Sequence, residues 1–179
     1  MTVSDGLSRG VTGAWNIVPT PFHPDGTLDE ESIPRLVDFV VATGVDGLTI
    51  LGVMGEAGKL GDAERSRVIA RTMDAAAGRI TVCVGVSHAA TARAAAFARE
   101  AAERGASSVM LAPPPMTRPT DAALRTHFET VADAVSIPVV IQDHPTSSGV
   151  VMSVDLIAAL HAAHAGLSVV KLEDEPSPR

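Results

Sequence analysis

Apolar residues recur along the chain in short, uninterrupted runs that are typical of buried strands. Six such runs are rich in β-branched side chains and stand at 14–18, 47–51, 80–84, 108–111, 138–141 and 167–170. Strands that are apolar on both faces, rather than on alternate positions, indicate a parallel sheet in a layered α/β fold. The pattern therefore predicts six buried parallel strands.

Longer amphipathic stretches, rich in Ala, Leu, Arg and Glu, separate these runs and predict five helices. Residues that favour a helix start stand at the beginning of each stretch, namely Asp29, Asp62, Thr91, Thr120 with Asp121, and Ser153. Glycines that could end a helix in the left-handed conformation follow four stretches, at Gly44, Gly78, Gly105 and Gly166. Strand and helix thus alternate, as in repeated right-handed βαβ units.

Two α/β architectures fit this alternation. An open, doubly wound sheet suits a chain of 179 residues, whereas an eight-stranded barrel usually needs roughly 250. A dinucleotide-binding sheet would carry Gly-x-Gly-x-x-Gly after its first strand, but residues 16–22 read Asn-Ile-Val-Pro-Thr-Pro-Phe. The pattern alone leaves barrel and open sheet equally open. Since no linker divides the chain, residues 1–179 are expected to form one domain.

The composition restricts the partners and the location of the protein. With 14 Lys+Arg against 21 Asp+Glu, the net charge of −7 argues against a nucleic-acid-binding protein. No apolar run reaches the roughly 18 residues of a membrane span, and the N-terminus shows no secretory signal. The single cysteine, Cys83, permits no internal disulfide. A cytoplasmic protein without a membrane partner is expected.

Candidate chemistry lies where the predicted strands end, because sites in parallel α/β folds form at that edge. Lys171 follows the last apolar run and is one of only two lysines beside twelve arginines. A lysine in apolar surroundings can lose its proton and attack a carbonyl carbon to form a Schiff base. The alternative is a solvated lysine at a strand end, paired with Glu173 or Asp174.

A second candidate is the segment Gly52-Val53-Met54-Gly55-Glu56, which follows the second apolar run. Its two glycines would let backbone N–H groups point inward and bind a small carboxylate. The alternative is a tight turn between strand and helix with no other role.

Histidines at strand ends raise the question of a metal. His88 and His144 could bind a divalent ion together with Asp143 or Glu56, whereas His161 and His164, three residues apart, could do so only weakly. A capping or surface role is the simpler interpretation of all four, so no metal site is expected.

As a set, the motifs resemble those of the dihydrodipicolinate synthase / N-acetylneuraminate lyase family, in family order and over nearly the whole chain. They are residues 13–22, Asp25-Gly26, Leu28-Asp29, residues 52–56 with Leu60 and Glu64, residues 84–87 with Thr91, Gly105-Ala106, residues 111–114, His127-Phe128, residues 145–149 and Val170-Lys171. The resemblance implies an α/β fold of the (β/α)8 TIM-barrel type, of which this chain would hold about six of the eight βα units.

The resemblance also implies a function. It implies a class I lyase or aldolase in which Lys171 forms an imine with pyruvate or a related 2-keto acid, and in which the Gly52–Glu56 turn binds the carboxylate of that acid. It implies no cofactor beyond this covalent imine. Its further implication is a homo-oligomer, either a tetramer or a dimer, that acts on a small molecule.

Several positions depart from the family pattern. Val53 and Met54 replace a pair of hydroxyl residues, Gln142 stands where a tyrosine acid/base is expected, and Ser147 replaces an arginine; the chain has no tyrosine. The departures predict a divergent lyase or dehydratase rather than a dihydrodipicolinate synthase, with Gln142, Asp143, His144 or a bound water at the site of proton transfer.

Two alternatives stay open beside this reading. The same departures fit a barrel that binds a keto acid without turning it over. A metal-dependent aldolase that uses His88 or His144 is the competing class of enzyme.

A barrel that stops after six strands leaves two edge strands unpaired. The sequence therefore predicts a C-terminally incomplete domain, completed by another segment or chain, and predicts that residues 1–179 alone are unstable.

Overall fold

The computed structural model describes residues 11–174 and contains one parallel sheet of six strands. They are β1 (Trp15–Ile17), β2 (Gly47–Ile50), β3 (Thr81–Gly85), β4 (Ser108–Leu111), β5 (Val139–Asp143) and β6 (Val169–Leu172). Each strand pairs in parallel with the next along the chain. All six predicted strands are confirmed, but β5 and β6 extend two residues further than predicted. Gln142, Asp143 and Lys171 therefore lie within strands and not after them.

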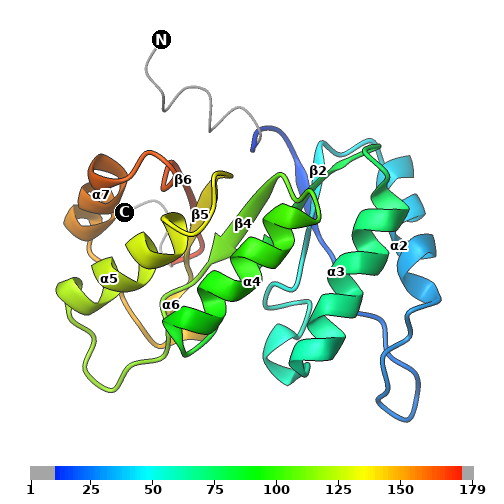
Figure 1. The fold of residues 1–179 in the computed structure, drawn as a ribbon, viewed down its shortest axis with the longest axis horizontal. Coiled ribbons are helices and arrows are strands. Elements are labelled where there is room, and N and C mark those ends of the chain that lie inside the picture. The colour runs from blue at the N-terminus through cyan, green and yellow to red at the C-terminus, as the bar shows by residue number, and fades with distance from the viewer. Residues whose placement is uncertain (1–10, 175–179) are drawn as a thin grey trace.

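Five helices of ten or more residues follow the strands, as the sequence predicts. They are α2 (Ser32–Ala42), α3 (Asp62–Ala76), α4 (Thr91–Glu103), α5 (Asp121–Ala132) and α7 (Val154–Ala163). Two short elements, η2 (Ala57–Lys59) after β2 and α6 (Pro145–Ser148) after β5, have no counterpart in the prediction. The long helices lie along one face of the curved sheet (Figure 1). The two ends of the predicted domain, residues 1–10 and 175–179, lie outside the described residues.

The predicted helix signals act as expected at five positions, whereas Asp62 and Thr91 are the first residues inside α3 and α4 and do not cap these helices. The hydroxyls of Thr120 and Ser153 accept hydrogen bonds from backbone N–H groups at the starts of α5 and α7. Gly44, Gly78 and Gly105 have φ values of 76°, 74° and 90°. The prediction that Gly166 ends a helix in the left-handed conformation is wrong. Helix α7 ends at Ala163, and the next residue, His164, is extended with φ of −141°.

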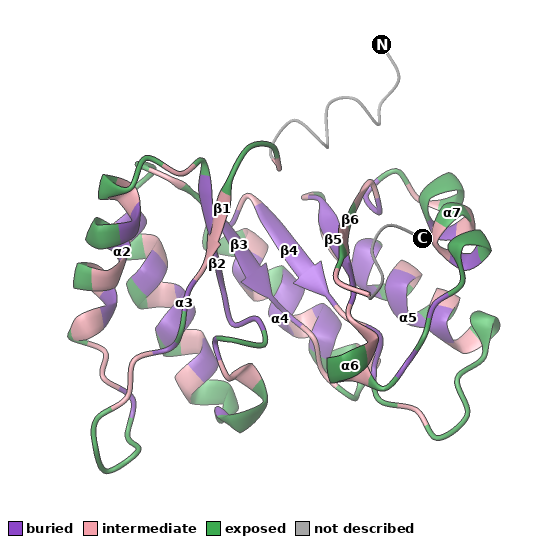
Figure 2. Ribbon diagram, turned by 180° about the vertical axis from the view of Figure 1, so that it is seen from behind, coloured by how far each residue is buried: buried purple, intermediate pink, exposed green. Residues whose placement is uncertain are grey.

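The sequential strand order decides between the two architectures. The long helices cover only the outer face of the sheet. Figure 2 shows the molecule from the other side, where the inner face of the sheet lies in front of these helices. A doubly wound sheet would reverse its strand order and carry helices on both faces. The structure is therefore a partial (β/α) barrel of six units, in which β1 and β6 each have one neighbouring strand.

The two faces of the sheet have different cores. The outer face packs its apolar side chains against the helices in one large cluster. On the inner face, buried Cys83, Met110 and Val140 pack with partly buried Trp15 and Val169. On the outer face of β6, Val170 and Leu172 are 40% and 37% exposed. The predicted incompleteness and instability of residues 1–179 stay predictions.

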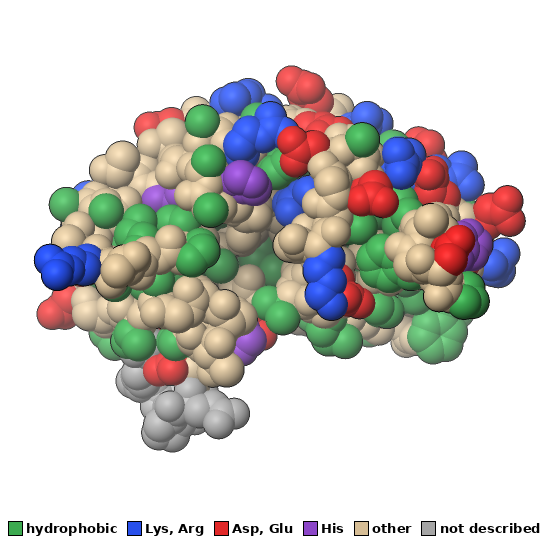
Figure 3. All heavy atoms as spheres, turned by 90° about the horizontal axis from the view of Figure 1, so that it is seen from below, with side chains coloured by type: hydrophobic (Ala, Val, Ile, Leu, Met, Phe, Trp, Pro, Cys, Tyr) green, Lys and Arg blue, Asp and Glu red, His purple; other side chains and the backbone are tan. Residues whose placement is uncertain are grey.

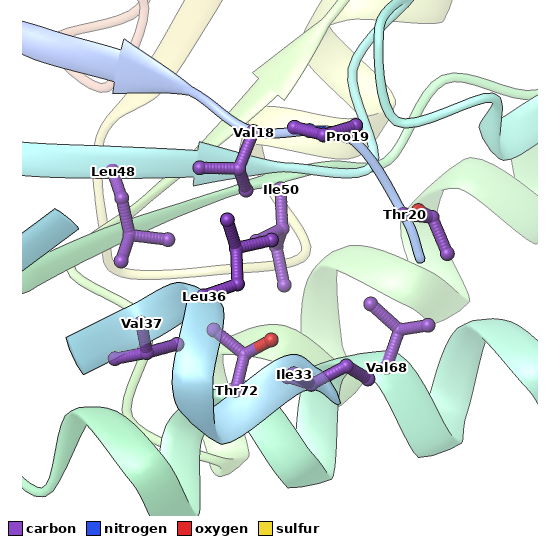
Figure 4. Close-up of a pocket in the computed structure, with 10 residues that line it drawn as sticks. All are labelled: Val18, Pro19, Thr20, Ile33, Leu36, Val37, Leu48, Ile50, Val68 and Thr72. Atoms are coloured by element: carbon purple, nitrogen blue, oxygen red, sulfur yellow. The ribbon is translucent and has the colours of Figure 1, made fainter. Parts of the chain in front are cut away.

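The outer core beneath α2 and α3 is closely packed. Side chains of β2 and of residues 18–20, which follow β1, meet those of the two helices around a space of only about 10 Å³ (Figure 4). Leu48 and Ile50 of β2 and Leu36 and Val37 of α2 line this space, and Thr20 and Thr72 are the polar residues of the lining. A space of this size holds about one water molecule, so it is too small for a substrate.

Candidate active site at the carboxyl ends of the strands

A cavity of about 520 Å³ opens where β2, β3, β4 and β5 end. Figure 3 looks onto this end of the molecule, where the surface is hollowed near its middle. Gly52, Val53 and Glu56 line the cavity on one side, and Gln142 lines it on the other. Cavities of this size suit small metabolites. The predicted turn and the predicted fifth-strand residue thus face one space.

The Gly52–Glu56 turn is held in an unusual backbone conformation. Leu51 and Glu56, which bracket it, have φ values of 56° and 51° although neither is glycine. Such left-handed residues cost roughly 1–2 kcal/mol each and are found at functional sites. The turn uses the N–H groups of Gly55 and Glu56 for its own hydrogen bonds. The N–H groups of Gly52, Val53 and Met54 are not used in this way, and the turn can offer them to a carboxylate.

Buried side chains fix the turn to its neighbours. The hydroxyl of Thr20, after β1, donates to the Gly55 carbonyl oxygen at 2.6 Å. From α3, the Arg65 guanidinium donates to the Gly85 carbonyl oxygen at 3.1 Å and to that of Ala57 at 3.3 Å. It also lies 4.2 Å from the centre of the Phe97 ring. Burial lowers the pKa of Arg65, although Glu100 acts in the opposite direction.

Lys171 lies beside Gln142 on the inner face of the sheet. The register of β5 and β6 pairs the two residues directly. Lys171 Nζ lies 2.8 Å from Glu173 Oε1, and Gln142 Nε2 donates to Glu173 Oε2, also at 2.8 Å. The side chains of Lys171 and Glu173 are each 29% exposed. The structure therefore contains the ion pair with Glu173 that the sequence offers as one interpretation of Lys171.

The carboxyl group of Glu173 has a lowered pKa. Burial raises it, but hydrogen bonds from Lys171 and Gln142, together with the charges of Lys171 and His144, outweigh the burial. The group is therefore held as a carboxylate. Sequence reasoning names Glu173 only as a possible salt-bridge partner. Its spacing of two residues from Lys171 is the available signal, because alternate residues of a strand share a face.

Asp143 and His144 occupy different positions around this group. Asp143 follows Gln142 in β5, so its fully buried side chain points to the opposite face, although its carbonyl oxygen accepts the N–H of Glu173 at 2.9 Å. His144 lies at the start of α6 and is close enough to affect the pKa of Glu173. The structure thus brings Lys171, Gln142 and Glu173 together, with His144 nearby.

The described residues contain no group of three or more His, Cys, Asp and Glu side chains placed to hold a metal ion. Three of the four histidines considered for a metal have local partners instead. His88 Nδ1 accepts the N–H of Ala90, His161 Nδ1 lies 3.1 Å from the Leu167 carbonyl oxygen, and His164 pairs with Asp133. In residues 11–174, no helix has both the length and the apolar character needed to cross a membrane.

Comparison with known proteins identifies the family. Residues 10–172 match the Dihydrodipicolinate synthetase family. The chain belongs to this family. A 4-hydroxy-tetrahydrodipicolinate synthase of Xanthomonas campestris pv. campestris is 35% identical over 167 residues, which are 92% of this chain and 55% of the relative. The chain thus spans about half the length of the curated relatives that it matches.

Solved structures agree with this assignment. Dihydrodipicolinate synthase from Aquifex aeolicus superposes with a TM-score of 0.87 at 32% identity, covering 91% of this chain and 55% of the other. A prophage protein of the same family from E. coli K12, solved in complex with pyruvate, gives a TM-score of 0.86 at 29% identity, with 90% and 54% covered. The predicted family and barrel architecture are therefore confirmed.

Proposed function

We propose that the chain is the Schiff-base-forming part of a lyase, aldolase or dehydratase that acts on pyruvate or a related 2-keto acid. The observation that carries this proposal is the position of Lys171. It lies on the inner face of the sheet, directly opposite Gln142, which lines the same cavity as the Gly52–Glu56 turn. A family member that was solved with pyruvate supports the class of substrate.

In this proposal the keto acid lies between the turn and the sixth strand. Its carboxylate accepts hydrogen bonds from the N–H groups of Val53 and Met54, while its C2 carbonyl carbon is attacked by Lys171 Nζ. The resulting iminium stabilises negative charge at C3 as an enamine. A proton on C3 is therefore lost more easily, and in a longer keto acid the C3–C4 bond breaks more easily. No cofactor is needed for this step. A cytoplasmic homo-oligomer is part of the same proposal.

Trapping with borohydride tests the proposal. The protein is incubated with pyruvate and borohydride, and tryptic peptides are analysed by mass spectrometry. We expect one reduced adduct on Lys171, its loss in Lys171→Ala, and its retention in Lys59→Ala, which removes the other lysine. Adduct formation in the presence of a chelator would argue against a metal-dependent aldolase. A lack of label on Lys171 with pyruvate and several longer keto acids would overturn the proposal.

A keto-acid-binding protein without turnover is the second candidate. It is favoured by Val53 and Met54, which carry no hydroxyl and are 54% and 58% exposed on the turn. Release of pyruvate from a 4-hydroxy-2-keto acid distinguishes the two functions. Release that requires Lys171 supports the enzyme, whereas an adduct on Lys171 without any release supports the binding protein.

A further inference from the structure

We propose that Glu173 is the catalytic acid and base that forms the imine at Lys171. This inference rests on the proposed Schiff-base function and adds a residue to it. The two carboxylate oxygens of Glu173 have separate partners. Oε1 lies 2.8 Å from Lys171 Nζ, and Oε2 accepts a hydrogen bond from the Gln142 amide at 2.8 Å. The oxygen that faces the nucleophile is thus within the distance of direct proton transfer.

The neighbouring side chains are less suited to this role. Gln142 has an amide, which neither gains nor loses a proton near neutral pH. Asp143 points to the other face of β5. His144 influences Glu173 electrostatically, but the buried Nδ1 of His144 has no hydrogen-bond partner among the described residues, Lys171 included.

The surroundings of Glu173 hold the carboxylate in place. Its backbone N–H donates to the Asp143 carbonyl oxygen, which extends the pairing of β5 and β6 by one residue. Gln142 then fixes Oε2, which leaves Oε1 directed at Lys171. We assign Gln142 the role of a positioning residue. The 29% exposure of Glu173 leaves one side of the group open to a keto acid and to water.

The proton transfers balance within this pair and the keto acid. Glu173 first takes a proton from the Lys171 ammonium, and the neutral amine attacks C2, so that the carbonyl electron pair moves to oxygen. Glu173 returns the proton to that oxygen, which gives a protonated carbinolamine. It then takes a second proton from nitrogen and gives it to the hydroxyl group, which leaves as water while the C=N bond of the iminium forms. Glu173 ends as a carboxylate, and both protons have passed from nitrogen to oxygen.

A purely electrostatic role for Glu173 predicts the opposite result on mutation. A carboxylate beside an ammonium group stabilises the protonated, unreactive form of the lysine. If Glu173 did only this, Glu173→Gln would increase the fraction of neutral Lys171 and speed imine formation. If Glu173 transfers protons, the same variant slows imine formation by about 100-fold, which is the usual size of a lost acid/base group. The sign of the change separates the two roles.

The experiment measures the rate at which the pyruvate adduct on Lys171 is trapped with cyanoborohydride, in the parent chain and in its variants. The pH runs from 3 to 9, because the lowered pKa of Glu173 places protonation of its carboxylate at the acid end of this range. We expect Glu173→Gln to be slow and to lose the decline toward acid pH that protonation of the carboxylate causes. Glu129→Gln, which removes a carboxylate from an exposed pair with Arg125, should match the parent. His144→Gln tests the other titratable group near Glu173 and should keep the acid decline.

The outcomes separate the role of Glu173 from the Schiff-base function. If the parent is labelled and Glu173→Gln is as fast or faster, the role of Glu173 is overturned while the Schiff-base function stands. If no keto acid labels the parent, both are overturned. Circular dichroism checks that each variant is folded. Should Glu173→Gln unfold, Glu173→Asp replaces it, because a retained but displaced carboxylate is expected to keep the acid decline at a rate below the parent.

Discussion

Gly85 and Leu51 lie so close together that a Cβ atom on Gly85 would stand 2.0 Å from the Leu51 carbonyl oxygen. This contact joins the end of β3 to Leu51, the residue between β2 and the Gly52–Glu56 turn. Leu51 has a left-handed backbone, so the carbonyl group cannot move aside without changing the conformation of the turn. A glycine at position 85 is therefore required for the shape of the proposed carboxylate site.

Substitution of Gly85 by alanine should lower the free energy of unfolding by roughly 1–3 kcal/mol, because the added methyl group overpacks this contact. It should also slow the trapping of pyruvate on Lys171, since the turn moves. Urea denaturation measures the first effect. The control is Gly58→Ala in η2, where an added Cβ meets nothing within 4 Å. Equal stability of the two alanine variants would contradict this account of Gly85.

Arg65 provides a second test of how the turn is positioned. Arg65 is 4% exposed, and its guanidinium donates to two carbonyl oxygens, that of Ala57 in η2 and that of Gly85 at the end of β3. Arg65→Met keeps much of the packing against Phe97 but removes both donors. We expect a loss of roughly 1–3 kcal/mol in unfolding free energy and weaker binding of pyruvate. Arg125→Met, which removes an exposed ion pair at 3.6 Å, should change stability by less than about 0.5 kcal/mol. If both variants unfold at the same urea concentration, the two hydrogen bonds of Arg65 do not stabilise the fold as proposed.

The sequence predicts the strands of this protein well because buried parallel strands are apolar on both faces. It also predicts which strand ends carry Lys171 and the Gly52–Glu56 turn, since both follow such runs directly. The order of the strands in the sheet is harder to predict from the sequence. Six βα units fit an open sheet and a partial barrel equally, and only the family resemblance or the observed pairing of sequential strands separates them.

The contacts within the site are harder to predict. Arg65 looks like any arginine of an amphipathic helix, because its buried surroundings, the ring of Phe97 and the carbonyl groups of Ala57 and Gly85, come from other elements. Gly166 looks like a helix terminator, but the helix already ends at Ala163. The left-handed backbone of Leu51 has no local signal at all, because leucine rarely adopts it and the tertiary contacts impose it.

Cys83 should be unreactive in the folded protein. It is 3% exposed among the inner-face side chains of the sheet, and burial raises the pKa of its thiol to about 11. Since the thiolate is the reactive form, a disulfide reagent at pH 8 should label the native protein very slowly. In denaturant, one thiol per chain should react at once. Rapid labelling without denaturant would show that the inner face opens on the time scale of the reaction.

His127 gives the stability of the protein a defined dependence on pH. It is 1% exposed in α5, and its Nδ1 lies 2.9 Å from the Thr91 hydroxyl at the start of α4. Burial lowers its pKa from 6.5 to about 4, although a hydrogen bond with the backbone of Ala112 acts in the opposite direction. The imidazole is therefore neutral in the folded protein at pH values where the unfolded chain is already protonated.

Because the unfolded chain binds the proton more tightly, His127 should destabilise the fold as the pH falls. Its contribution is fully present above pH 6.5 and is lost progressively between about pH 6.5 and pH 4, by up to about 3 kcal/mol. Urea denaturation at half-unit intervals of pH measures this loss. In His127→Gln the acid-dependent decline over this interval should shrink by that amount, even if the variant is less stable at pH 7. His23→Gln, which changes a half-exposed histidine, should retain the decline of the parent. An unchanged decline in His127→Gln would show that other groups cause it.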